Sequence, residues 1–526
     1  MRSYEVLLLV AKLIPLAFAF AFGACIGSLI NVIVYRMPRG IGIVSPPSAC
    51  PACGTHLTWR ENIPVLGWVL LRGRCRFCRS RISAEYPIVE AAVGLLIAGF
   101  FGLWYLTPPD AHWAWIGWGS IRPAWAGGGF TATWPLFVVL VVLLGSLAAM
   151  TLVDAKTTMI PLGLAWFPTA VALVGYTGFA AWLEYAGAGG LSRSETGYAW
   201  SIPTPGPADW GWIAASIGGI VGIGLGNVLL ATGLIHRSFE GYEAWERETY
   251  GGDSGAAQEE RGKADKPDAP ATGDGRRSEP GPAPREGFWR AVGAALLAVV
   301  VLGVVGGVTA GVFGLNPWVG AGPGVLLGPI VGGLFTRRLW PRVKSRSEGQ
   351  PSSQAEVWIL YPHARREMVR ELAFVAPCVL LAWVGWKVGP MLGGTGISAT
   401  LASLWVRVLA GVLTGYLVGG GIVWGARILG TLAFGKEAMG LGDVHLLAAV
   451  GACLGWIDPT LAFFVFAPFV GLYGVLLMWA WAGSGSRALP YGPSLAVGTV
   501  LVLLGKPLIV AGLNLLMRGA APIAIP

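Results

Sequence analysis

Charged residues are scarce in this chain. Of its 526 residues, 12% are Asp, Glu, Lys or Arg and 54% are hydrophobic, and the mean hydropathy is +0.63. An average soluble protein has roughly twice that share of charge, about 25%. The shortage of charge therefore excludes an ordinary soluble protein and predicts a chain that faces lipid over most of its surface.

Cysteine is also rare, and its placement excludes a disulfide framework. The chain has seven cysteines, and Cys25, Cys378 and Cys453 each lie within an apolar run. Isolated cysteines in such runs are usually small buried residues. The other four stand in two close pairs, a pattern typical of a metal site.

No cleavable signal peptide is evident, because the first apolar run extends over residues 6–34 and is longer than the hydrophobic core of a signal. We expect this run to remain as the first membrane span. Further apolar runs recur along the chain, and about 18 residues suffice to cross a bilayer. We therefore predict an all-α polytopic membrane protein with about 12 transmembrane helices. The expected spans are residues 6–35, 86–107, 133–153, 161–183, 210–235, 289–315, 318–335, 371–392, 404–430, 443–457, 461–482 and 494–517.

Arginine and lysine predict the orientation in the membrane. The net charge is +9, and the loop of residues 36–85 alone contains eight arginines against two glutamates. Short loops rich in these residues lie on the cytoplasmic side. We therefore expect this loop in the cytoplasm, the N-terminus outside, and a lipid bilayer rather than nucleic acid as the partner of the basic charge.

The expected domain organisation follows from these runs and from one polar stretch. Residues 250–286 contain almost no large apolar residues and are expected to be disordered. The predicted divisions are a first transmembrane helix (1–35), a cytoplasmic zinc-binding domain (36–85), a membrane region (86–235), a disordered cytoplasmic linker (236–288), an additional membrane region (289–430) and a last membrane region (431–526).

Two CxxC motifs stand in the arginine-rich loop, Cys50 with Cys53 and Cys75 with Cys78. Each CxxC turn points two sulfurs toward one ion, and two turns supply the four ligands of a tetrahedral zinc site. A redox-active CxxC or a chance pairing is the alternative, and His56 is a further candidate ligand. A site closed by four sulfurs has no open coordination position, so its expected role is structural.

Asp443 stands at the start of an apolar run, directly after Gly440, Leu441 and Gly442. An ionisable residue in a membrane segment is costly, which makes it a functional candidate by default. Gly440 and Gly442 let the backbone bend and leave room for a substrate strand beside the carboxylate. The alternative for Asp443 is a helix N-cap, which stabilises a helix by about 1 kcal/mol.

A second aspartate, Asp154, ends the third expected span on the same cytoplasmic side. Taken alone, it fits a boundary residue that pairs with Lys156. Two carboxylates that share a low-dielectric site hold one proton between them. One then acts as a base on water while the protonated one polarises a carbonyl, as in aspartic proteases. The proximity of Asp154 to Asp443 is a hypothesis here, because sequence alone contains no distance.

Several segments together resemble the type IV prepilin peptidase family. The N-terminal segments look like that family's first domain, and the GxGD motif that ends at Asp443 is similar to that of the family and of other intramembrane aspartic proteases. Asp154, followed by Ile160 and Pro161, resembles the family's other catalytic segment. The segments that carry the resemblance are residues 23–36, 50–78, 82–90, 154–161, 440–443 and 489–493.

The resemblance implies an activity and its cofactors. Members of the family are inner-membrane aspartic endopeptidases that remove the leader of type IV prepilins and pseudopilins on the cytoplasmic side, in pilus and type II secretion systems. Many also methylate the new N-terminal residue with S-adenosylmethionine. By resemblance, Asp154 and Asp443 are the catalytic pair and the four loop cysteines hold structural zinc. No GxGxxG-type loop on a soluble strand–helix unit is present, so no residue is assigned to the methyl donor.

The chain departs from the family pattern at several positions. His445 stands where lysine is common, Lys156 where a second acidic residue is frequent, and Leu162 where a polar residue is common. The interval between Asp154 and Asp443 is also longer than usual and contains about four extra expected spans. None of these changes removes a residue that the chemistry requires.

Two other functions fit parts of the pattern. One is a transporter with a zinc-clipped cytoplasmic loop, although transporters place ionisable residues at mid-bilayer within repeated halves and no repeat is evident here. The other is a non-catalytic pilus or secretion assembly factor that keeps the peptidase scaffold. Such a factor would leave prepilin processing intact when Asp154 and Asp443 are replaced by asparagine.

Overall fold

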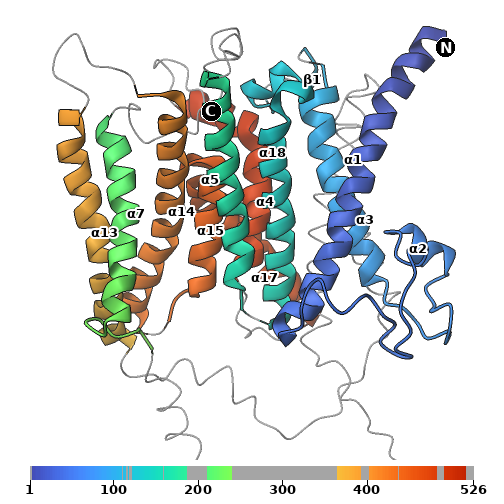
Figure 1. Ribbon diagram of the computed structural model, residues 1–526, viewed down its shortest axis with the longest axis horizontal. Coiled ribbons are helices and arrows are strands. Elements are labelled where there is room, and N and C mark those ends of the chain that lie inside the picture. The colour runs from blue at the N-terminus through green and yellow to red at the C-terminus, as the bar shows by residue number, and fades with distance from the viewer. Residues whose placement is uncertain are drawn as a thin grey trace, which may run out of the picture.

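The computed structural model is a bundle of long helices that run roughly parallel to one another (Figure 1). It describes residues 3–108, 110–113, 116–117, 121–157, 159–185, 210–239, 364–392, 402–435, 437–482 and 491–516. Within these residues, nine helices are long and apolar enough to cross a membrane. The prediction of a multi-pass helical membrane protein is therefore confirmed in the part of the chain that the structure describes.

Nine of the expected spans correspond to these helices. They are α1 (Ser3–Arg36), α3 (Glu85–Phe101) with the π-helical turn Gly102–Leu106, α4 (Phe130–Thr157), α5 (Leu162–Tyr185), α7 (Trp210–Ala231), α13 (Ala364–Leu392), α14 (Leu404–Phe434), the stretch Ile457–Gly474, and α18 (Gly492–Leu516). The stretch Ile457–Gly474 consists of α16 (Ile457–Leu461), a π-helical turn (Ala462–Phe466) and the start of α17 (Ala467–Ala482).

The other three expected spans have different outcomes. The span predicted at residues 443–457 is α15 (Leu441–Leu454), whose 14 residues are shorter than a bilayer crossing requires. The spans at 289–315 and 318–335, and most of the predicted linker, lie outside the described residues. The predicted count of twelve therefore compares with nine candidate spans and one short apolar helix among the described residues.

The loops between helices lie at two opposite ends of the bundle. The arginine-rich loop after α1 contains the short helix α2 (Leu66–Leu70) and lies beside the lower halves of α1 and α3 (Figure 1). The loop after α3 forms a small ribbon in which β1 (His112–Trp113) pairs antiparallel with β2 (Ile116–Gly117), and it lies at the upper end (Figure 1). This alternation is what successive membrane crossings require.

The core lies mainly between α3, α4, α5, α14, α15 and α18, with a few residues of α1 and α17, and their buried apolar side chains form one cluster. Phe100, Leu143 and Leu447 are fully buried within it. At the edge of the bundle, large apolar side chains are exposed instead, such as Phe18 on α1 and Met391 on α13. Because the chain is a membrane protein, we interpret these outer faces as the surface that contacts lipid. Helices α7 and α13 pack against each other and stand beside α14 at one edge (Figure 1).

Helices α14 and α15 approach so closely that their backbones touch. A β-carbon built on Gly415 of α14 would overlap the carbonyl oxygen of Gly451 on α15, and one built on Gly451 would overlap the carbonyl oxygen of Gly415. Small residues at a helix crossing are the usual means of close packing in membranes. This contact sets the position of α15, the helix that begins at the GxGD motif.

We expect Gly415→Val to destabilise the protein by about 1–3 kcal/mol or more, because the new side chain must push α15 away. Gly421→Val is the matched control, since it places the same residue in the same helix with nothing within 4 Å of the new β-carbon. Thermal unfolding in detergent measures the difference. Equal unfolding midpoints for the two variants would contradict the close contact.

Candidate metal centre and active site

The two CxxC turns have the same backbone conformation. In each, the N–H of the first cysteine donates to the carbonyl five residues on, at 2.9 Å for Cys50 and 2.8 Å for Cys75. The residue four positions on donates back to the carbonyl of that cysteine and has a positive φ, +69° at Gly54 and +60° at Arg79. Glycine adopts this conformation freely, whereas arginine does so at some cost. The two turns are therefore two copies of one backbone conformation.

The four sulfurs form one cluster. One ligand atom from each of Cys50, Cys53, Cys75 and Cys78 lies within 4.8 Å of all the others, and the Sγ atoms of Cys50 and Cys78 are 3.9 Å apart. A tetrahedral zinc ion with Zn–S bonds of about 2.3 Å separates its sulfurs by about 3.8 Å. The cluster can therefore hold a metal ion such as zinc, as the sequence predicts. His56 is not a member of it.

Hydrogen bonds favour the thiolate at Cys50 and Cys78, whereas desolvation and the thiols of those two cysteines raise the pKa of Cys75. The backbone of Cys53, together with that of Ala52 and the side chain of Ser80, lowers the pKa of Cys50 to about 6. The side chain and backbone of Ser80 also lower the pKa of Cys78. Metal ligands of this type must be thiolates, so the chemistry of the donor set fits zinc.

One contact joins the cysteine domain to α3, and a second joins the start of α3 to the end of α4. The N–H of Val65, next to α2, donates to Oε2 of the buried Glu90 on α3 at 2.7 Å. At the start of α3, Glu85 forms a salt bridge of 2.6 Å with Lys156 in the last turn of α4. The C-terminal end of α4 is thereby held at the end of the bundle where the cysteine domain attaches. Lys156 pairs with Glu85, so Asp154 does not need it as a boundary partner.

The structure brings Asp154 and Asp443 together. Both are buried, with 6% and 8% of their surface exposed. A β-carbon built on Gly492, the first residue of α18, would lie 2.7 Å from Oδ2 of Asp154 and 3.3 Å from Oδ1 of Asp443. The two distances add up to 6.0 Å, which is the largest separation that these two oxygens can have. Among the residues that the structure describes, no Lys, Arg or His forms a salt bridge with either carboxylate.

The glycines of the GxGD motif have distinct places. Gly440 is the N-cap of α15, with an extended backbone, so Asp443 lies inside the first turn and is not the N-cap. The alternative interpretation of Asp443 as the helix N-cap is therefore wrong. Gly442 faces Ile160, because a β-carbon there would lie 2.9 Å from the β-carbon of that residue. The segment after α4 thus packs directly on the motif.

Gly492 is a functional candidate that the sequence analysis did not assign a role. Its lack of a side chain leaves the space that faces both carboxylates. The only available signal was its position in the segment 489–493, which resembles a late turn of the peptidase family. A local motif cannot show that this turn meets two aspartates from distant parts of the chain.

Comparison with known proteins addresses the first part of the chain. Residues 21–104 match the family model described as the bacterial peptidase A24 N-terminal domain. The N-terminal region is therefore similar to this family domain, and the match covers less than a fifth of the chain. This region contains the four clustered cysteines and ends before either aspartate. No solved structure matches the chain.

Curated relatives of this region are named as prepilin leader-processing enzymes. A prepilin leader peptidase/N-methyltransferase of Myxococcus xanthus is 52% identical over 79 residues, which cover 15% of this chain and 24% of the relative. One from Burkholderia pseudomallei is 40% identical over 113 residues, covering 17% and 37% of the two chains. A type 4 prepilin-like proteins leader peptide-processing enzyme of Escherichia coli is 37% identical over 110 residues, covering 18% and 39%. The chain thus spans well under half the length of these relatives.

We expect the purified protein to contain about one zinc ion per chain and Cys75→Ser to lose it on dialysis, because three sulfurs hold the ion more weakly than four. Cys25→Ser is the control, since Cys25 is an exposed thiol on α1 outside the cluster. Metal content by mass spectrometry measures both. A zinc-free wild-type protein with the cysteine domain still folded would contradict the prediction.

Proposed function

We propose that this protein is an inner-membrane aspartic endopeptidase that removes the leader peptide from type IV prepilins or pseudopilins on the cytoplasmic side. The observation that carries the proposal is the meeting of two buried carboxylates, Asp154 and Asp443, at the end of the bundle where a peptidase A24 N-terminal domain attaches. Helix ends far apart in the sequence supply the pair, and no basic side chain in the described residues neutralises it.

The geometry suits general acid–base hydrolysis of a peptide bond. Two buried carboxylates this close share one proton. The ionised carboxylate removes a proton from a water molecule, which attacks the carbonyl carbon of the scissile bond, while the protonated carboxyl donates a hydrogen bond to the carbonyl oxygen. The proton then passes to the leaving amine as the C–N bond breaks.

Three glycines shape the surroundings of the proposed catalytic pair, and Ile160 packs against Gly442. Gly440 and Gly442 precede Asp443, and Gly492 faces both carboxylates. An extended peptide can reach a carboxylate only where no side chain stands in front of it. We therefore assign Gly440 and Gly442 to shaping the site, and we add Gly492 to them.

The cysteine cluster supports this site without taking part in the reaction. A four-sulfur zinc site has no open position for water or substrate. Its proposed role is to fold the loop of residues 36–85, which in turn contacts α3 through Glu90. Zinc is thus expected to stabilise the cytoplasmic domain rather than activate a nucleophile.

Methylation of the new N-terminal residue is a separate part of the proposal. It rests on the printed names of two relatives, which include N-methyltransferase. The described residues contain no glycine-rich strand–helix unit for S-adenosylmethionine, since their only named strands are β1 and β2. No residue is therefore assigned to the methyl donor and no step is derived through it.

A transporter or a non-catalytic assembly factor is less well supported. The two aspartates lie at helix ends beside the cysteine domain, whereas transporters place such residues at the bilayer midplane. An assembly factor has no need of two unneutralised carboxylates in one buried site, which is costly to maintain.

We expect Asp154→Asn and Asp443→Asn each to reduce prepilin leader cleavage by about a thousandfold or more, because neither amide can act as the base. The assay uses purified protein in proteoliposomes with a prepilin substrate. Asp110→Asn, in an exposed loop, is the control. Normal cleavage by both active-site variants, with zinc retained, would leave the assembly-factor interpretation standing and end the protease proposal.

We expect Gly492→Ala to lower the cleavage rate by roughly a hundredfold, because a displacement of a catalytic group by about 1 Å is enough for such a loss. The new methyl group would lie 2.7 Å from Oδ2 of Asp154 and would force that carboxylate to move. Gly512→Ala on the same helix has nothing within 4 Å and is the matched control. Equal rates for the two variants would show that Gly492 does not face the reacting groups.

A further inference from the structure

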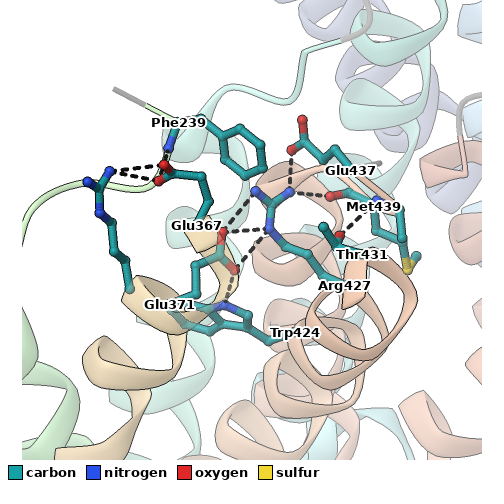
Figure 2. A network of polar contacts seen from close by, with 10 residues as sticks. Phe239, Glu367, Glu371, Trp424, Arg427, Thr431, Glu437 and Met439 are labelled. Carbon is teal, nitrogen blue, oxygen red and sulfur yellow. Dashed lines mark hydrogen bonds and ion pairs between the residues drawn. The ribbon is translucent and has the colours of Figure 1, made fainter. Parts of the chain in front are cut away.

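Arg427, near the C-terminal end of α14, is a fully buried charge with 1% of its side chain exposed. Its Nε donates to Oε1 of Glu371 at 2.9 Å, and its Nη2 lies 2.9 Å from the same oxygen. Its Nη1 donates to the carboxylate of Glu437 and to the main-chain carbonyl of Met439 (Figure 2). A guanidinium is suited to such a position, because its donors point in several fixed directions at once.

The partners of Arg427 include the loop that leads into the GxGD motif. Met439 directly precedes Gly440, the N-cap of α15, and Asp443 lies in the first turn of that helix. Thr431, one turn after Arg427, accepts a hydrogen bond from the N–H of Ala438 at 3.1 Å. The end of α14 therefore holds residues 437–439 by a side-chain contact at each of the three positions (Figure 2).

The other side of the network is α13, a helix from the long interval between the two aspartates. Glu371 is 4% exposed and also accepts a hydrogen bond from Nε1 of Trp424 at 2.9 Å. One turn earlier, Glu367 accepts from the N–H of Phe239 at 3.0 Å and pairs with Arg370 (Figure 2). The Phe239 ring, after the end of α7, lies 5.4 Å from the guanidinium carbon of Arg427. Helices α7 and α13 are thus bound into one polar network with α14.

We propose that Arg427 is a positioning residue for Asp443, with Glu371 as its anchor on α13. Glu371 holds the guanidinium in one orientation, and the guanidinium holds the carbonyl of Met439 and the carboxylate of Glu437. This fixes the start of α15 and therefore the distance between Asp443 and Asp154. The α7–α13 pair is then a structural support of the active site rather than a separate appendage. The functional part of this proposal rests on the proposed peptidase activity.

The first test replaces the guanidinium of Arg427 with an ammonium, which keeps the positive charge but removes the several fixed hydrogen-bond donors. Arg427→Lys has one ammonium and cannot reach Glu371, Glu437 and Met439 together. We expect leader cleavage to fall roughly tenfold to a hundredfold in kcat with little change in KM, because the substrate still binds and the catalytic pair is misplaced. Glu437→Gln, which removes one loop contact at a half-buried position, should fall in the same direction. Arg365→Lys, an exposed arginine at the same end of the bundle, is the control.

The second test separates a positioning role from simple pairing of two helices. In the double variant Glu371→Arg with Arg427→Glu, the ion pair between α13 and α14 is restored, but a glutamate at 427 cannot donate to Glu437 or Met439. We expect the swap to recover part of the thermal stability lost by Glu371→Arg alone, because the α13–α14 pair is restored while the new carboxylate at 427 faces Glu437. We expect kcat to stay low. Recovery of wild-type kcat together with stability would overturn the proposal, because it would show that pairing α13 to α14 is sufficient.

A third measurement does not depend on peptidase activity. Amide hydrogen exchange over residues 437–442 should become at least several-fold faster in Arg427→Lys than in the wild type, with α5 unchanged as the internal reference. Unchanged exchange in this loop would overturn the positioning role even if cleavage falls. Faster exchange in a protein whose wild type cleaves no prepilin would support the loop contact and count against the peptidase proposal. Where Arg427→Lys does not fold, Glu437→Gln provides the same comparison.

Discussion

A charge buried among membrane helices is stable only when it has a partner, and this requirement governs where the few charges of this chain lie. Arg427 is enclosed by carboxylates and a carbonyl. Asp458, buried beside α18, pairs with Lys506 at 3.1 Å. Lys156 pairs with Glu85 where α4 meets the cysteine domain. Asp154 and Asp443, the proposed catalytic pair, differ from this pattern, because they lie close to each other and no described basic residue forms a salt bridge with either.

That exception has a physical interpretation. A pair of carboxylates costs less to bury when it shares one proton than when both are ionised. In the proposed mechanism a shared proton takes the place of an external cation, and the same proton serves the hydrolysis. The surrounding structure must supply the stability that the pair lacks. The close contact of Gly415 with Gly451 and the network of Arg427 both hold α15 against α14.

The sequence predicted those features of the structure that depend on residues close together in the chain. Apolar runs predicted the helices, and the spacing of the cysteines predicted a four-sulfur cluster, because each depends on neighbours in the sequence. The two aspartates could be placed on one side of the membrane from charge alone, but their approach to within 6.0 Å depends on how helices pack. Gly492 and Arg427 could not be found this way, since their partners lie in distant segments. Arg427 in particular looks like one charge near the end of an expected span, with no sign that three carboxyl or carbonyl groups surround it.

The positions that depart from the family pattern can now be judged by their surroundings. Lys156 lies at the end of α4 and pairs with Glu85, so its charge serves the attachment of the cysteine domain rather than the pair of aspartates. His445 follows Asp443 by two residues on α15, and residues two apart on a helix point in different directions. It therefore faces a different neighbour from Asp443. Leu162 begins α5 with its side chain exposed. Lys156 thus has a partner of its own and Leu162 is exposed. The geometry of the proposed site depends instead on Gly492 and on the loop that Arg427 holds.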